Sequence, residues 1–266
     1  MLGPVGRYLP PLGLAAALLI AWQAYVRLAK VPATLLPAPS DIVTGSLQSA
    51  DVLAVHATQT LAETIAGFVL AVLVAAAVAA ATDLSQLVKR ALLPLLVVSQ
   101  TVPMVALAPL LVLWFGFGIL PKVLVVALVC FFPIVVATAY GLASTDVELI
   151  KLYRTFGASR RHIFFRVRVP TALPSVFAGL RIAVTYSVVG AIFGEYAGAF
   201  QGLGVLLQTT KNAYRTDLMF GTIVVTATLS LCLYGFVTLL ERLLIPWSIV
   251  PEGDRQWRGA AGNPTS

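Results

Sequence analysis

The sequence predicts an all-α polytopic membrane protein, and three observations carry this fold class. Of 266 residues, 59% are hydrophobic and 11% charged, and the mean hydropathy is +0.93, whereas soluble domains carry about 25% charged residues. Charge-free runs of about 20 residues, the length that crosses a bilayer core, recur along the chain. Basic residues gather in alternate connections. We therefore predict one transmembrane domain over 1–250 and a disordered cytoplasmic tail over 251–266.

Six transmembrane helices are expected, each bounded by the charged residues that end an apolar run. They are placed at 9–29, 58–81, 92–115, 119–141, 175–199 and 219–245. The first is interpreted as a retained helix, because it is longer than the apolar region of a signal peptide and lacks a small-residue cleavage site. The third contains three prolines and should be irregular, since freed backbone groups in lipid need a neighbouring helix or a water-filled cavity.

Two outer segments are expected between these helices. In the segment 30–57, the run Pro39-Ser40-Asp41 is a helix start signal and predicts a short helix on the outer face. The second outer segment is 200–217.

The connection 142–174 is basic and has a helical period. Apolar residues recur at i, i+3, i+4 and i+7, which form one stripe of an α-helix: Leu149, Leu152, Tyr153 and Phe156. Gly157 should end this helix, because glycine readily takes the left-handed conformation. Ser159 is a candidate N-cap for a second short, arginine-rich helix, which Pro170 and Pro174 should close.

The distribution of basic residues predicts the orientation. If 142–174 is cytoplasmic, its six basic residues join Arg7, Lys89, Arg90, Arg242, Arg255 and Arg258 on the inside. The outside then holds only Arg27, Lys30, Lys122, Lys211 and Arg215. Short cytoplasmic loops are enriched in Lys and Arg, so both termini are expected in the cytoplasm. The net charge of +7 is explained by a basic membrane face and requires no nucleic acid.

The connection 142–174 resembles the cytoplasmic loop of ABC importer permeases. That loop reads roughly Glu-Ala-Ala, three residues, Gly, then a spacer that ends in an aliphatic-Pro pair. Gly157 takes the glycine position, Val169-Pro170 takes the pair, and Gly157-Ala158-Ser159 is also typical. Lys151-Leu152-Tyr153 departs from Glu-Ala-Ala, so no role is carried over from the usual glutamate. The nearest acid, Glu148, lies about one turn earlier.

Further landmarks resemble the nitrate/sulfonate/taurine branch of this family. They occur in the right order between about residues 33 and 247: Leu36-Pro37-Ala38-Pro39-Ser40-Asp41, the run 103–118, Gly179-Leu180-Arg181 and Gly202-Leu203-Gly204. At Gly194-Glu195-Tyr196 and in the run 214–220 the chain looks closer to permeases for pyrimidine thiamine precursors or riboflavin.

The resemblance implies the permease subunit of a type I, binding-protein-dependent importer in a bacterial inner membrane. Two permease chains, expected as a homodimer, would form the pathway. Two cytoplasmic ABC ATPase subunits would use ATP and Mg, and an external substrate-binding protein would deliver a small polar organic or anionic solute. This chain would then be no enzyme and bind no cofactor itself. Its ATPase-coupling residues would be Glu148, Leu149, Leu152, Tyr153, Phe156, Gly157, Ala158 and Ser159.

Few residues carry other chemistry. There is no phosphate-binding G-x-x-x-x-G-K-[ST] loop, no Rossmann fingerprint and no G-x-S-x-G elbow. The two histidines, His56 and His162, lack metal-ligand spacing and are interpreted as interfacial residues. No catalytic residue or metal site is expected. A membrane enzyme is therefore disfavoured, and an ATPase-independent secondary transporter or channel remains the alternative.

Charged and small residues within the spans are candidates for the pathway. Glu195 either lies at the mouth of the pathway or at the dimer gate, or else reaches interfacial water. Glu63 is either a structural charge or an interfacial residue. Arg181 either forms a structural pair or reaches toward headgroups. Gly190 and Gly194 form a G-x-x-x-G pair near Ser187, which favours close helix approach. That approach is either a permease–permease contact or packing within one bundle.

Overall fold

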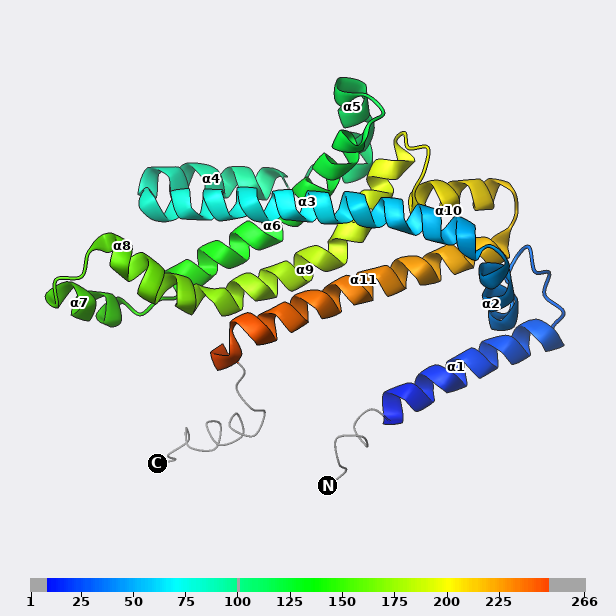
Figure 1. The fold of residues 1–266 in the computed structure, drawn as a ribbon. Helices are drawn as coiled ribbons and strands as arrows, with labels where there is room; N and C mark the ends of the chain where they lie inside the picture. The colour runs from blue at the N-terminus through cyan, green and yellow to red at the C-terminus, as the bar shows by residue number, and fades with distance from the viewer. Residues whose placement is uncertain (1–8, 100, 249–266) are drawn as a thin grey trace, which may run out of the picture. The chain divides into compact units, whose positions relative to one another are not determined.

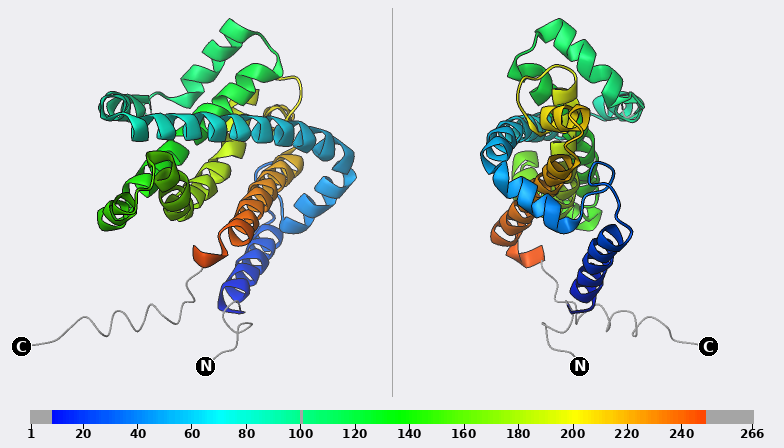
Figure 2. Two further views of the ribbon diagram at one scale, coloured as in Figure 1. Left: turned by 60° about the vertical axis from the view of Figure 1, so that its left-hand side comes forward. Right: turned by 90° about the vertical axis from the view of Figure 1, so that its right-hand side faces the viewer.

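The computed structural model describes residues 9–99 and 101–248, and every regular element in these ranges is a helix (Figures 1 and 2). In order they are α1 (Leu9–Leu28), α2 (Pro39–Gln48), α3 (Ala50–Leu84), α4 (Gln86–Ser99), α5 (Met104–Phe115), α6 (Ile119–Ala143), α7 (Val147–Thr155), α8 (Arg160–Ile163), α9 (Val169–Tyr196), α10 (Leu203–Asn212) and α11 (Thr216–Leu244). The all-α prediction is confirmed. The tail predicted over 251–266 lies outside the described residues.

Five of these helices are long and apolar enough to cross a membrane: Leu9–Leu28, Ala50–Thr82, Ile119–Ala143, Arg160–Tyr196 and Thr216–Leu244. They match the first, second, fourth, fifth and sixth predicted spans. Many of their large apolar side chains are exposed, such as Leu73 and Leu231. Exposed apolar surface on this scale suits a hydrocarbon environment.

The third predicted span, 92–115, is wrong as one continuous helix. The region is divided into α4 and the shorter apolar α5, and Pro103 directly precedes α5. Proline has no backbone N–H, so it is tolerated at a helix start but removes a hydrogen bond inside a helix. Pro94 and Pro109 do lie inside α4 and α5.

Two other predicted boundaries also need correction. The second span was expected from 58, but α3 begins at Ala50, immediately after the short helix α2. Pro170 and Pro174 were expected to close the arginine-rich helix, yet one helical run continues from Arg160 to Tyr196. A π-helical turn at Phe164–Arg168 joins α8 to α9, so Pro170 lies in the first turn of α9, where its missing N–H is least costly.

The contacts divide the chain into two compact units. The first contains the chain up to Ala66, Met104–Val125 and Val188–Leu229. Here α2 is tied to α1 by the Arg27–Asp41 ion pair at 2.6 Å, and Leu53, Leu206 and Leu218 form a small buried cluster.

The second unit contains Gly67–Pro103, Val126–Ser187 and the chain from Ser230 onward. Phe177 and Val184 on α9 pack with Val237 on α11 in its core. Gly179 lets α9 approach α6 closely, since an added Cβ would lie 2.9 Å from the Pro133 carbonyl oxygen.

Candidate functional site

The helix α7 forms where its local sequence satisfies both helix ends. The Asp146 side chain accepts a hydrogen bond from the Glu148 backbone N–H at 2.7 Å, which caps the N-terminus. Glu148 in the first turn and Arg154 in the last turn also complement the helix dipole. At the other end, Gly157 has φ +76° and its N–H donates to the Arg154 carbonyl at 2.9 Å. The predicted helix and its glycine stop are therefore confirmed.

No residue of α7 is buried. In the apolar stripe, Leu149 is 38% exposed, Leu152 is 51% exposed and Phe156 is 80% exposed. An isolated helix of this length is marginal in water. An exposed stripe on so short a helix suits a surface that a partner covers.

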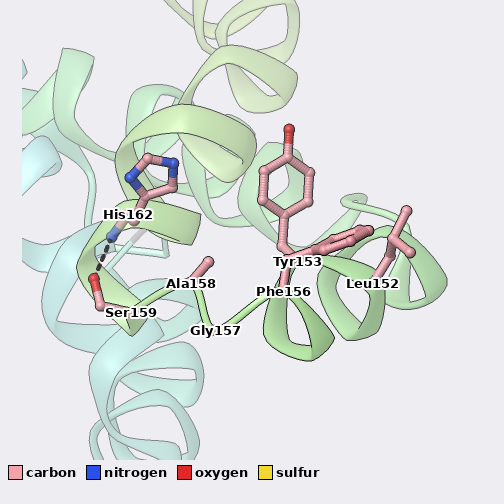
Figure 3. A pocket seen from close by; sticks show the side chains of 7 residues that line it. All are labelled: Leu152, Tyr153, Phe156, Gly157, Ala158, Ser159 and His162. Atoms are coloured by element: carbon pink, nitrogen blue, oxygen red, sulfur yellow. Dashed lines mark hydrogen bonds between the residues drawn. The ribbon is translucent and has the colours of Figure 1, made fainter.

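A groove of about 760 Å³ lies beside this stripe, between α7 and α8 (Figure 3). It is lined by Leu152, Tyr153, Phe156, Gly157, Ala158, Ser159 and His162. Tyr153 and His162 stand on either side of the Gly157–Ala158 turn. The structure thus brings six of the eight predicted coupling residues to one groove. Glu148 and Leu149 do not line it, and His162, which was interpreted only as an interfacial residue, does.

The far wall of the groove is anchored to the second unit. Ser159 caps α8, accepting from the His162 N–H at 3.3 Å as predicted, and Ile163 and Val167 are buried. The Arg168 guanidinium donates to the Leu142 carbonyl at 3.0 Å. The helical run that begins with α8 is therefore tied to the end of α6.

A buried polar network lies in the first unit, at the N-terminus of α10. The first backbone N–H groups of a helix have no partner within it. Here the Gly202 N–H donates to His56 Nδ1 at 2.9 Å, the Leu203 N–H to Thr60 Oγ1 at 2.8 Å, and the Gly204 N–H to Glu195 Oε2 at 2.5 Å. Side chains of α3 and α9 thereby satisfy the amide that precedes α10 and the first two amides of α10.

Glu195 is the centre of this network. It is 2% exposed, and its Oε1 also accepts from Thr60 Oγ1 at 2.6 Å. A Cβ at Gly202 would collide with the Glu195 carboxylate, and Gly202 has φ +133°. Glycine is thus required at Gly202 by close approach as well as by backbone conformation.

Two further charged residues are buried in the same unit. Glu63 is 1% exposed and Lys122 is 3% exposed. Lys122 Nζ donates to the carbonyls of Phe117, Gly118 and Gly198 at 2.9–3.0 Å. Glu63 and Lys122 also line one pocket, of about 190 Å³. The sequence analysis treated Lys122 only as an outer charge and did not predict its burial. Its place as a lone cation between two long apolar runs was a signal that it could be buried.

The small residues of α9 are buried as well. Gly194 packs against Lys122 of α6, where an added Cβ would lie 3.0 Å from the Lys122 Cα. Its close approach is therefore made within one chain. Gly190 is buried, and Ser187 is buried with its hydroxyl bonded to the Val184 carbonyl at 2.6 Å.

In the second unit, Arg181 of α9 pairs with Glu241 of α11. The Nη1–Oε2 distance is 2.9 Å, and the two side chains are 33% and 14% exposed. Apolar side chains of the same two helices, Leu180 and Leu240, pack in the neighbouring core. Removal of one partner would leave the other charge beside this apolar surface. The pair therefore fixes α9 against α11.

We expect Arg181→Met and Glu241→Gln each to destabilise the protein by about 1–3 kcal/mol, because each leaves the other charge without its partner. The loss of stability in the double variant should be smaller than the sum of the losses in the two single variants. Thermal unfolding of the four proteins in one detergent measures this coupling. Strict additivity would contradict a structural role for the pair.

No group of three or more His, Cys, Asp or Glu side chains that could hold a metal ion occurs in the described part of the chain. The second unit provides an exposed apolar groove beside α7, and the first unit provides a buried polar network at the N-terminus of α10.

Residues 52–246 match the family described as the binding-protein-dependent transport system inner membrane component. Three curated relatives align along most of their length. A probable ABC transporter permease of Haemophilus influenzae is 36% identical over 91% of this chain and 99% of its own. The formylaminopyrimidine transport permease of Halalkalibacterium halodurans is 38% identical over 86% of this chain and 92% of its own. The riboflavin transport system permease of Chloroflexus aurantiacus is 37% identical over 90% of this chain and 91% of its own.

Proposed function

Because this chain belongs to the binding-protein-dependent transport family and is an ABC transporter permease, we propose that it forms the membrane pathway of an ATP-driven importer for a small polar organic solute. The groove beside α7 is the observation that carries the proposal. Two of these chains would enclose the pathway, and each groove would receive one ABC ATPase subunit. ATP and Mg would be bound by the ATPase, and an extracytoplasmic binding protein would deliver the solute.

The mechanism would be alternating access. An ATPase dimer can shift the permease between inward-open and outward-open states only if it binds the two states with different affinity. The groove supplies a contact through which that difference would act, because its α8 wall is continuous with α9. The ion pair of Arg181 and Glu241 would then transmit the motion of α9 to α11.

For the substrate, we favour a pyrimidine thiamine precursor or riboflavin over nitrate, a sulfonate or taurine. The permeases named for formylaminopyrimidine and riboflavin are 38% and 37% identical to this chain over 86% and 90% of its length. Two permeases named for aliphatic sulfonates and taurine are 30% identical over 90% and 89% of it, and a second one named for aliphatic sulfonates is 34% identical over only 56%. Calorimetry of the cognate binding protein with each compound would identify the solute. Selective binding of taurine or a sulfonate would overturn this preference.

The proposed orientation places 142–174 and both termini in the cytoplasm. We expect a reporter inserted after Pro39 or after Lys211 to be accessible from outside the cell, and one inserted near Ser144 to be protected. The bias of basic residues is the physical reason. The reverse pattern would place the α7 groove on the wrong side for an ATPase.

Cysteine crosslinking tests the docking itself. A cysteine at Leu152 should crosslink to a cysteine in the ATPase surface, whereas one at Val43 in α2, which is also exposed, should not. The alternative, a secondary transporter, draws support from the buried charges of the first unit. Uptake by the purified chain without ATPase, combined with no crosslink from Leu152, would favour that alternative.

A further inference from the structure

A small pocket of about 190 Å³ lies in the first unit, where the connection between α5 and α6 meets the connection between α9 and α10. Gln59 and Glu63 of α3 also line it. In the proposed orientation Lys122 and the segment 200–217 lie outside, so a solute released by the binding protein would reach this pocket early. A cavity of about 150 Å³ can hold a benzene ring. The volume therefore suits a single ring.

Lys122 holds two walls of the pocket together. Its Nζ donates to the carbonyls of Phe117 and Gly118 in one connection and of Gly198 in the other, at 2.9–3.0 Å. These bonds use all three N–H donors of the ammonium group. An added Cβ at Gly198 would lie 2.9 Å from the Phe117 ring, so the backbone of one connection packs on the aromatic side chain of the other. The pocket is thus formed before a solute arrives, as small-molecule sites usually are.

Two exposed aromatic side chains form one wall. Phe117 is 63% exposed and Phe200 is 84% exposed, and their ring centroids lie 6.4 Å apart with an interplanar angle of 44°. Both line the pocket. Their ring faces offer a surface on which a planar ring can stack. The wall therefore favours a flat, unsaturated solute over an aliphatic one.

Gln59 supplies the polar part of the site. Its Nε2 donates to Glu63 Oε1 at 2.9 Å, and this bond fixes the orientation of the amide. A side-chain amide has two N–H donors and a carbonyl acceptor, so a second N–H and the carbonyl oxygen can bind a solute. With this adjacent donor and acceptor, glutamine recognises the amino group and ring nitrogen of adenine. A single ring with an amino group beside a ring nitrogen offers the same partners.

We propose that this pocket binds the solute during import, and that the solute carries an aminopyrimidine-like ring. The ring stacks on Phe117 and Phe200, its amino group donates to Gln59 Oε1, and its ring nitrogen accepts from Gln59 Nε2. This inference rests on the proposed importer function and narrows its solute class, because the larger fused-ring system of riboflavin could not lie wholly inside the pocket.

Ligand-observed NMR tests the site with the full-length permease in phosphatidylcholine nanodiscs, without ATPase or binding protein. The two probes are 4-amino-2-methylpyrimidine and 2,4-dimethylpyrimidine, which has a methyl group in place of the amino group. We expect the amino probe to bind about tenfold or more tightly than its analogue, because a site built to bond a polar group rejects a ligand that lacks it. Gln59→Leu should remove this difference between the probes.

Phe200→Ala should weaken binding of both probes by about fivefold or more, because it removes a stacking surface. Its control is Phe115→Ala. That ring is 50% exposed in the same unit but does not line the pocket, so this variant should bind like the wild type. Both side chains are well exposed, and neither change should prevent folding.

Three results would overturn the proposal: no binding of the amino probe, equal affinity of the wild type for both probes, or equal effects of Phe200→Ala and Phe115→Ala. The third would show that the aromatic pair faces lipid. Any of them, found together with a crosslink from Leu152 to the ATPase, would leave the importer function standing and remove only this site.

Discussion

Replacing Phe156 with aspartate is expected to abolish ATP-driven import while leaving the chain folded in the membrane. Phe156 is 80% exposed, so its contribution to folding is small. A carboxylate buried against an apolar partner surface loses hydration without gaining a partner, at a cost of several kcal/mol. Each 1.4 kcal/mol is tenfold in affinity, so we expect ATPase binding to weaken by about 100-fold or more. Co-purification and solute uptake measure the two effects.

The matched control is Thr155→Asp. Thr155 is exposed at the end of α7 but does not line the groove. The variant therefore carries the same new charge one residue away from Phe156, and we expect it to bind the ATPase normally. Gly157→Val provides an independent route to the same loss, because a β-branched residue is strained at φ +76°. If Phe156→Asp and Thr155→Asp behave alike, the groove is not the ATPase contact.

The elements that sequence reasoning located well depend on local signals. The first span ends within one residue of prediction, and α7 has its predicted stripe and glycine end within 142–174. These features arise from charge-free length and from residues three or four apart, which a single sequence displays. The basic, amphipathic loop was therefore identified before any fold was known.

The helix boundaries predicted from prolines were wrong in two different ways. In 92–115 the prolines were expected to bend one helix, but the region is two helices. At Pro170 and Pro174 they were expected to end a helix, but the helix continues. A proline inside a helix removes one hydrogen bond, whereas a proline at a helix start does not. Whether the chain breaks or continues depends on how neighbouring turns compensate, here through the π-helical turn at Phe164–Arg168.

The buried polar network at the N-terminus of α10 could not be predicted from sequence patterns. Thr60 lies 135 residues from Glu195 and 143 from Leu203 along the chain. Their proximity follows from the packing of α3 against α9 and α10, which no periodicity encodes. Glu195 and Glu63 were recognised as unusual charges, but their burial could not be distinguished from interfacial exposure without that packing.

Replacing Thr60 with valine should therefore destabilise the protein strongly, although the two side chains have nearly the same shape. Thr60 is fully buried and is the only described side chain that bonds both Glu195 and the Leu203 N–H. The substitution leaves a carboxylate oxygen and a backbone donor unsatisfied in the interior. Each such group costs about 1–3 kcal/mol, so we expect a loss of about 2–5 kcal/mol in the free energy of unfolding.

Thr64→Val is the matched control, one turn further along the same helix. Thr64 is 1% exposed, and its hydroxyl has no hydrogen-bond partner. Removal of an unsatisfied buried hydroxyl should be neutral or stabilising. Both variants bury the same methyl group in α3, so helix propensity and volume cancel in the comparison. Melting temperatures in one detergent should fall by several degrees for Thr60→Val and remain level or rise for Thr64→Val. Equal shifts would mean that Thr60 contributes only packing, and that α10 keeps its capped N-terminus through His56 and Glu195 alone.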